Sequence, residues 1–231
     1  MKNKIEILGI IPARSGSKTI KNKNLIKIKG NPLIFYTLKE AKKSKLISKL
    51  IVSTDSNKIA NFCKGKGVEI PFLRPKNISK DNSKDSDVIN HAFNFFFKKK
   101  ITYKYIVYLR PTSPLRKHED IDKAICKMIY NNKFSSLRSI KKINSNEHPY
   151  WMVKKNKNLI EPFSKKNNYT KFYRKQLLPD CFKLSGFIDI IDTKNCNKKN
   201  IYGKKTTFFD VDEIDIDVDT INDVILLNKI M

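Results

Sequence analysis

The sequence alternates between short apolar segments rich in Ile and Val and longer segments whose apolar residues recur at helical spacing. The first apolar run covers residues 5–12, and the segment 30–45 follows it with Asn31 and Pro32 placed to begin a helix. The same order recurs, with strands predicted at 49–55, 105–111 and 134–140 and helices at 56–67, 87–99 and 118–132. This alternation is typical of an α/β protein with an open, largely parallel sheet.

The alternation breaks off over residues 141–180, where the sequence is polar with scattered aromatic residues. We expect an arm here, inserted into a single domain that spans residues 1–231. Strands are predicted again at 182–191 and 205–219, and a final helix at 220–230 with Thr220 as its N-cap. Ligands of open α/β sheets bind beyond the carboxyl ends of the strands. We therefore expect three loops to converge on one cleft: residues 13–24, 74–87 and 110–117.

The chain is strongly basic, with 48 Lys and Arg against 22 Asp and Glu and a net charge of +26. Such a charge occurs in nucleic-acid-binding proteins, and a basic nucleic-acid-binding module is one alternative. The excess is mostly Lys scattered among Asn and Ile, without Arg-rich or aromatic clusters. This pattern favours anionic small-molecule substrates, with no nucleic acid as a partner.

The cysteines and the N-terminus bear on the compartment. The four Cys are far apart and lack CxxC spacing, so neither a zinc site nor a disulfide framework is indicated. The apolar run near the N-terminus is too short to span a bilayer and continues directly into a turn. We expect a soluble, cytoplasmic protein that does not bind a membrane.

The loop after the first predicted strand has the composition of a phosphate-binding site. It carries the hydroxyls of Ser15 and Ser17 around Gly16, with nearby cations at Arg14, Lys18, Lys21 and Lys23. Backbone amides in such a turn bind phosphate oxygens, and the cations neutralise them. The loop is not a Walker A motif, because Ser17 separates Gly16 from Lys18, and it lacks the dinucleotide GxGxxG pattern. A solvated basic turn is the alternative.

An acidic segment near the C-terminus is the one acidic island in this chain. If residues 214–219 form a strand, one face carries carboxylates and the other carries Ile214, Ile216 and Val218. Clustered carboxylates need a cation to offset their repulsion, and hard oxygen ligands suit Mg²⁺. The alternative is an exposed acidic edge strand that deters aggregation.

The segment "LRPTSPLR" at 109–116 places Thr112 and Ser113 between Arg110 and Arg116, in a loop fixed by two prolines. Arg binds carboxylates and phosphates through paired hydrogen bonds. A rigid connection with its arginines in solvent explains this segment equally well.

Several segments together resemble the CMP-sialic acid synthetase family, which makes CMP-activated nonulosonic acids. They are "IPARSGSK", "KNKNL", "STDS", "LRPTSPLR", "LPDCFKLSG" and "IDVDTINDV", in the family's order from about residue 10 to the C-terminus. The resemblance implies a Rossmann-like nucleotidyltransferase fold, a mostly parallel sheet flanked by helices with a protruding dimerisation element. It also implies Mg²⁺-dependent transfer of CMP from CTP to a nonulosonic acid, pyrophosphate release, and a homodimer.

The resemblance extends to individual residues. Nucleotide-binding positions are Arg14, Ser15, Gly16, Ser17, Lys18, Lys23, Asn24, Arg74 and Ser83. Asp217 and Asp219 match the Mg²⁺-binding pair, and Asp215 lies outside it. With Arg14 and Lys18 these two aspartates are the expected catalytic residues, in an in-line attack of the sugar acid's anomeric hydroxyl on the α-phosphorus of CTP. The sugar acid is expected to contact Arg110, Thr112, Ser113, Arg174, Lys175 and Ser185.

The chain also departs from the family's pattern. Arg110 replaces a usual Gln, Trp151 a frequent Lys and Lys175 a usual Arg, while Ser185 and Asp189 stand for Asn and Tyr. Such positions face the acyl sugar or the neighbouring subunit in the family. The departures favour a di-amino relative such as legionaminate or pseudaminate over N-acetylneuraminate. A cytidylyltransferase for another sugar acid such as Kdo, a nucleotidyltransferase for a sugar phosphate and an inactive scaffold are the alternatives.

Overall fold

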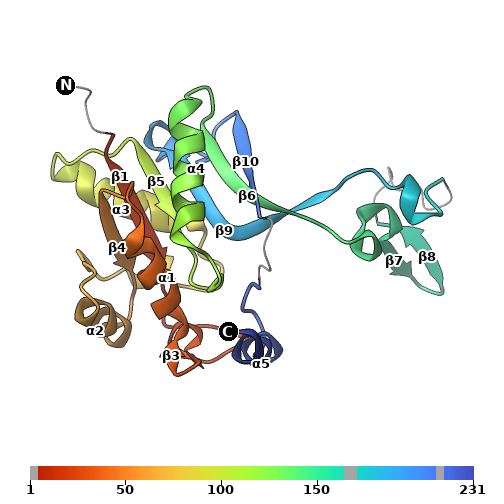
Figure 1. Ribbon diagram of the computed structural model, residues 1–231, viewed down its shortest axis with the longest axis horizontal. Helices are drawn as coiled ribbons and strands as arrows, with labels where there is room; N and C mark the ends of the chain where they lie inside the picture. The colour runs from red at the N-terminus through yellow and green to blue at the C-terminus, as the bar shows by residue number, and fades with distance from the viewer. Residues whose placement is uncertain (1–4, 164–170, 212–215) are drawn as a thin grey trace.

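The computed structural model describes residues 5–163, 171–211 and 216–231, and its centre is a six-stranded sheet in the order β10-β6-β9-β5-β1-β4 (Figure 1). These strands are β1 (Ile7–Pro12), β4 (Lys49–Ser53), β5 (Tyr105–Tyr108), β6 (Ser136–Lys142), β9 (Phe182–Asp192) and β10 (Thr206–Asp210). Strand β1 is parallel to β4 and β5, and β10 is parallel to β6. Strand β9 is antiparallel to β5 and β6. The predicted largely parallel sheet is therefore confirmed.

The described α-helices are α1 (Leu33–Lys43), α2 (Asn57–Gly65), α3 (Asp85–Lys98), α4 (His118–Tyr130) and α5 (Ile221–Ile230). The hydroxyl of Ser56 caps α2 by accepting from the Ile59 N–H at 3.4 Å, and Thr220 caps α5 in the same way. Helix α1 begins after Pro32, one residue later than predicted. Among the described residues no helix has the length and apolar character needed to cross a membrane.

Apolar side chains cover both faces of the sheet. Alternate residues of β1 point to opposite faces, so Ile7 and Ile11 pack with α1 and α4, whereas Leu8 and Ile10 pack with α3. All four side chains are buried. The two buried layers fix the strand ends, and thereby the loops that follow them.

Within the segment predicted as an arm, 141–180, the described residues 141–163 and 171–180 protrude from the sheet (Figure 1). Strands β6 and β9 leave the sheet as a pair, joined as far as Lys142 and Phe182. Beyond them lies the hairpin of β7 (Val153–Asn156) and β8 (Leu159–Pro162). A second short hairpin, β2 (Lys27–Ile28) with β3 (Asn31–Pro32), precedes α1.

The predicted strand at 205–219 is wrong in its second half. Strand β10 ends at Asp210, and residues 216–219 form an irregular segment. The Val218 N–H donates to the carbonyl of Thr112 at 2.8 Å, so this segment joins a loop and not a strand ladder. Its apolar alternation has another cause: Ile216 and Val218 pack on a separate apolar cluster with Leu33. Residues 212–215, including the acidic positions there, lie outside the described residues.

Candidate active site

Strands β4, β1 and β5 are neighbours and parallel, so their carboxyl ends lie along one edge of the sheet. The loops after β1 and β5, together with the loop 74–87 that leads into α3, line one pocket, which we call the loop pocket. Its polar lining comprises Arg14, Gly16, Ser17, Lys23, Asn24, Arg74, Lys80, Asp81, Ser83, Asp85, Tyr108, Arg110 and Thr112. The predicted convergence of three loops is confirmed.

Neighbouring side chains hold the first loop in shape. Asp55 accepts hydrogen bonds from both the N–H and the hydroxyl of Ser15, each at 2.7 Å. The Asn24 amide donates to the Arg14 carbonyl at 2.9 Å, and Ser17 Oγ lies 3.5 Å from the Ile20 nitrogen. Asp55 and Asn24 therefore hold the backbone of this loop, and Asp55 also accepts from the Ser15 hydroxyl.

The two expected catalytic cations of this loop meet at a carboxylate. The Arg14 guanidinium is bonded to Asp81, and Lys18 Nζ lies 3.8 Å from the other oxygen of Asp81. Lys18 is mostly exposed, with 79% of its side-chain surface accessible. No sequence pattern singles out Asp81 beyond its place in the loop 74–87. The pocket thus contains its own anion beside the cations that were expected to bind phosphate.

Arg74 forms a rigid wall of the loop pocket. It is 5% exposed, and its Nε donates to Ser53 Oγ at 3.1 Å, while its terminal nitrogen bonds the carbonyl of the same residue. Burial lowers the pKa of Arg74 below its ordinary value. Ser83 Oγ accepts from the Lys80 N–H at 2.9 Å. Both expected cytidine-binding positions are therefore held in place by local hydrogen bonds.

A second pocket lies beside the first, and we call it the acidic pocket. It is lined by Lys141, Lys183, Leu184, Ser185, Gly186, Ile216, Asp217, Asp219, Asp223 and Leu226. Lys23 connects the two pockets, because its Nζ donates to the Val218 carbonyl at 2.8 Å and to Asp219 Oδ1 at 2.9 Å. A Cβ at Gly186 would lie 3.5 Å from Arg110 Cδ and 3.8 Å from Asp217 Oδ2. The two pockets therefore meet at Gly186.

Carboxylates of the acidic pocket have the donor chemistry of a magnesium site. Asp217 and Asp219 both line it and offer hard oxygen ligands. A different group, Glu40 with His118 and Glu119, brings possible metal ligands within 4.8 Å of one another outside both pockets. Glu40 accepts from Lys43 and from the His118 N–H, which accounts for this group without a metal.

A family model described as Cytidylyltransferase matches residues 8–221, which include the loop pocket and all of the acidic pocket except Asp223 and Leu226. The chain belongs to the cytidylyltransferase family. It is therefore a nucleotidyltransferase, and the family indicated by its motifs is confirmed.

Relatives of this cytidylyltransferase include a Legionella pneumophila subsp. pneumophila protein named CMP-N,N'-diacetyllegionaminic acid synthase. The two are 32% identical over 237 residues, which cover 98% of this chain and 97% of that protein. A pseudaminic acid cytidylyltransferase of Campylobacter jejuni subsp. jejuni is 34% identical over 131 residues, 57% of this chain and 55% of that protein. The solved structure of CMP:2-keto-3-deoxy-manno-octonic acid synthetase complexed with CTP has a TM-score of 0.73 and 17% identity, covering 98% of each chain. At that identity the similarity concerns the fold.

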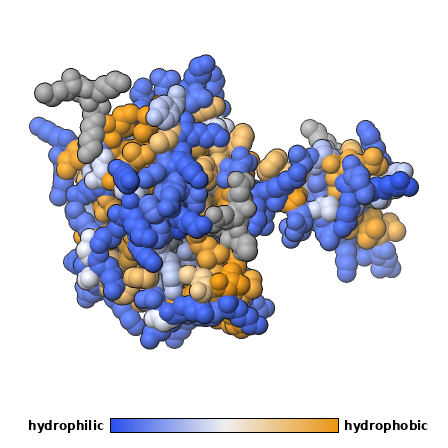
Figure 2. Space-filling view, viewed as in Figure 1, coloured by the Kyte–Doolittle hydropathy of each residue, from blue (hydrophilic) through white to orange (hydrophobic). Residues whose placement is uncertain are grey.

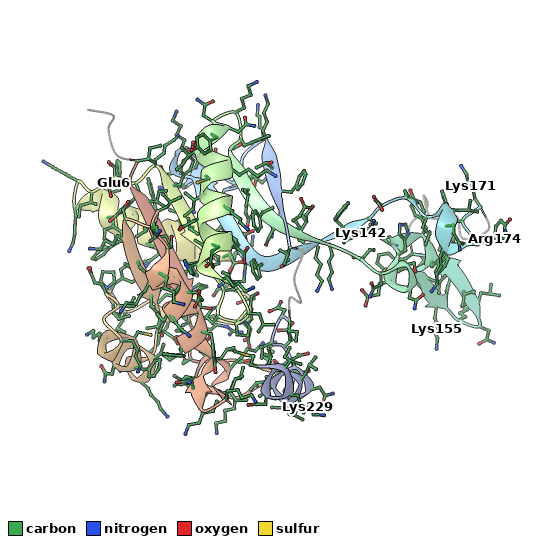
Figure 3. The ribbon with its side chains drawn as sticks, viewed as in Figure 1. Glu6, Lys142, Lys155, Lys171, Arg174 and Lys229 are labelled. Atoms are coloured by element: carbon green, nitrogen blue, oxygen red, sulfur yellow. The ribbon has the colours of Figure 1, made fainter. Side chains whose placement is uncertain are left out.

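The expected sugar-acid contacts of the cytidylyltransferase are spread over four locations: the two pockets, the interior and the arm. Thr112 and Arg110 line the loop pocket and Ser185 lines the acidic pocket. Ser113 is buried at 1% exposure, and its hydroxyl has no hydrogen-bond partner among the described residues. Arg174 and Lys175 are exposed near η5 (Lys175–Leu177) on the arm, outside both pockets; Figure 3 labels Arg174 there.

Two other singled-out positions have structural partners. Trp151 donates from its indole nitrogen to the Phe172 carbonyl at 2.6 Å and so ties two parts of the arm together. Arg116, buried at 2% exposure, donates from Nε to the Phe187 carbonyl at 2.5 Å. Arg116 thus anchors its loop to β9 and does not present a free cation to a ligand.

Proposed function

We propose that this cytidylyltransferase transfers CMP from CTP to a nonulosonic acid of the legionaminic type and releases pyrophosphate. The observation that carries the proposal is the junction at Gly186 between a pocket lined by cations and a pocket lined by carboxylates. The choice of sugar acid is supported by the relative named CMP-N,N'-diacetyllegionaminic acid synthase, with which the chain aligns along nearly its whole length.

In this proposal CTP occupies the loop pocket. Arg14 and Lys18 pair with the phosphates. Arg74 and Ser83 hold the cytidine, because both line that pocket and local hydrogen bonds fix their side chains. The anomeric oxygen of the sugar acid forms a bond to the α-phosphorus and loses its proton to solvent. The bond from the α-phosphorus to the bridging oxygen breaks, and pyrophosphate leaves with that electron pair.

Asp217 and Asp219 would hold Mg²⁺, since both are carboxylates at the pocket that adjoins the expected phosphates. When bound, Mg²⁺ neutralises phosphate charge and lowers the pKa of the attacking hydroxyl. Lys23 pairs with Asp219 in the structure, so this lysine limits the repulsion between the two carboxylates before any substrate enters.

The arm would form a homodimer interface. Exposed apolar residues gather near the hairpin of β7 and β8 at its outer end (Figure 2). Leu159 and Phe163 are each 69% exposed, and Ile160 is 64% exposed. A second copy that covers these side chains removes apolar surface from water. Such a dimer also gives Arg174 and Lys175 a role at the partner's sugar-acid site, which they do not reach in their own chain.

The test is an assay of purified protein with CTP, Mg²⁺ and a panel of legionaminic, pseudaminic, N-acetylneuraminic and Kdo acids. We expect pyrophosphate release only when all three components are present, and a CMP adduct of legionaminic acid by mass spectrometry. A CMP adduct of Kdo alone would support the other sugar-acid alternative, and no adduct with any acid would contradict the proposal.

The nucleic-acid alternative is separated by two further measurements. An enzyme of this kind is stabilised thermally by CTP but not by other nucleoside triphosphates. A nucleic-acid-binding module instead binds duplex or single strands with a steep dependence on salt. An inactive scaffold shows neither response.

A further inference from the structure

The central strands bring two arginines and two aspartates together beside the loop pocket. Arg110 follows β5, Arg138 lies on β6, Asp189 lies on β9 and Asp85 begins α3. In the sheet register Asp189 is opposite Tyr108 on one side and opposite Arg138 on the other. The sheet itself therefore places this carboxylate between its partners.

Asp189 is a fully buried carboxylate whose two oxygens both have donors. Arg110 Nη2 donates to its Oδ2 at 2.9 Å, and Arg138 Nε donates to its Oδ1 at 3.2 Å. The hydroxyl of Tyr202 also donates to Oδ2, at 3.2 Å. Asp189 is 0% exposed, so removal of either arginine leaves a buried charge with one fewer partner.

Arg110 is held from two sides. The nitrogen that contacts Asp189 also donates to Asp85 Oδ2 at 2.6 Å, and the guanidinium lies over the Tyr108 ring, 5.1 Å from its centre. Burial lowers the pKa of Arg110, but the attraction of Asp189 and Asp85 more than reverses this effect and raises it overall. We call Asp85 and Asp189 the Arg110 clamp.

The Arg110 guanidinium, held by the Arg110 clamp, lies where the two pockets meet. Arg110 lines the loop pocket, and its Nη1 is 3.5 Å from the Gly186 carbonyl. Gly186 and Asp217 both line the acidic pocket. The missing side chain at Gly186 leaves room between Arg110 and Asp217, since a Cβ there would contact both. An anionic group that spans the two pockets therefore passes Arg110.

We propose that Asp189 is a positioning residue, which together with Asp85 fixes Arg110 at the junction so that Arg110 binds the carboxylate of the sugar acid. This inference rests on the proposed function. Arg110 and Asp189 depart from the family's sequence pattern at separate positions, and the structure joins the two departures in one ion pair. This dependence predicts that the two substitutions are coupled. Once Arg110 is replaced, replacing Asp189 should not change the KM for the sugar acid further.

The first test compares Asp189→Asn with Arg138→Gln in steady-state assays. We expect Asp189→Asn to raise the KM for the sugar acid about tenfold, equivalent to about 1.4 kcal/mol, with the KM for CTP changed less than about twofold. Arg138→Gln is the matched control, because Arg138 contacts the same carboxylate but lines neither pocket. It should lower the melting temperature and leave the KM for the sugar acid unchanged.

The second test is a double-mutant cycle. Arg110→Gln and Arg110→Gln/Asp189→Asn should have the same raised KM for the sugar acid. This pair remains informative if Asp189→Asn alone does not fold, because the double variant removes both charges together. A further KM increase in the double variant would overturn the proposal. So would an Asp189→Asn variant that melts earlier but keeps the wild-type KM. A wild-type protein that turns over no sugar acid would instead refute the proposed function.

Discussion

Substitution of Asp81 by Asn should tighten CTP binding. Asp81 lines the loop pocket and pairs with Arg14 and Lys18, the two cations proposed to meet the phosphates. A triphosphate and this carboxylate therefore compete for the same positive charges. The Asn side chain keeps the shape of Asp81 but removes its charge, so the competition ends.

The expected gain in CTP affinity is small, because the Arg14–Asp81 ion pair is partly exposed to solvent. The side chains of Arg14 and Asp81 are 32% and 39% exposed, so their ion pair is worth about 1 kcal/mol at most. Lys18 is too exposed, and its 3.8 Å contact too long, to add a significant amount. About 1 kcal/mol corresponds to a roughly fivefold lower Kd for CTP.

Calorimetric titration with CTP, without sugar acid and with EDTA, isolates this effect from metal binding. Glu69→Gln is the matched control, because Glu69 pairs with Lys49 at 2.8 Å and is not a residue of the loop pocket, and it changes the net charge equally. The difference between the variants should shrink as salt is added. If Asp81→Asn binds CTP no more tightly than Glu69→Gln, Asp81 does not compete with the triphosphate. Weaker binding would mean that Asp81 helps to position Arg14.

Three other predictions test the proposed Mg²⁺ ligand, the proposed dimer and the ionisation of the Tyr202 hydroxyl. Asp219→Ala should lower kcat by about 100-fold with saturating substrates, because it removes a proposed Mg²⁺ ligand; near-normal pyrophosphate release by a folded variant would disprove the metal assignment. Leu159→Asp/Ile160→Asp should be monomeric by light scattering, since both apolar side chains are exposed on the arm; a persistent dimer would place the interface elsewhere. Burial of the Tyr202 side chain and, to a lesser extent, the charge of Asp189 raise the pKa of Tyr202 to about 12. The folded protein therefore retains a proton that the unfolded chain loses near pH 10. The resulting stabilisation is lost as pH rises from 10 to about 12, and Tyr202→Phe should lose less melting temperature over that range; equal losses would show that another group titrates there.

The elements that the sequence predicted correctly depend on local residues. Ser56 and Thr220 accept hydrogen bonds from the first turns of their own helices, and the strands are apolar runs that the helices bury on both faces. The acidic segment misled because Ile216 and Val218 alternate for packing on an apolar cluster, without strand hydrogen bonds. Periodicity registers which face is buried but not the hydrogen bonds of the backbone.

The ion pairs of the site could not be predicted in the same way. Arg14 and Asp81 are 67 positions apart, and Arg110 and Asp189 are 79 positions apart. Their contacts depend on which strands become neighbours, above all on the antiparallel placement of β9 beside β5. Local pattern therefore predicted which loops form the cleft but not the carboxylates that pair with its cations.

These carboxylates change what the net charge of +26 means for function. Three cations of the loop pocket are offset by carboxylates, because Arg14 pairs with Asp81, Lys23 with Asp219 and Arg110 with Asp189. An anionic substrate must exchange places with these internal anions, or share a cation with them. Exchange keeps the number of ion pairs made by these cations unchanged, so CTP binding should depend on salt less steeply than nucleic-acid binding, which releases many counterions from a polyanion. The scattered lysines give the chain its charge, whereas the internal carboxylates offset cations of the site itself.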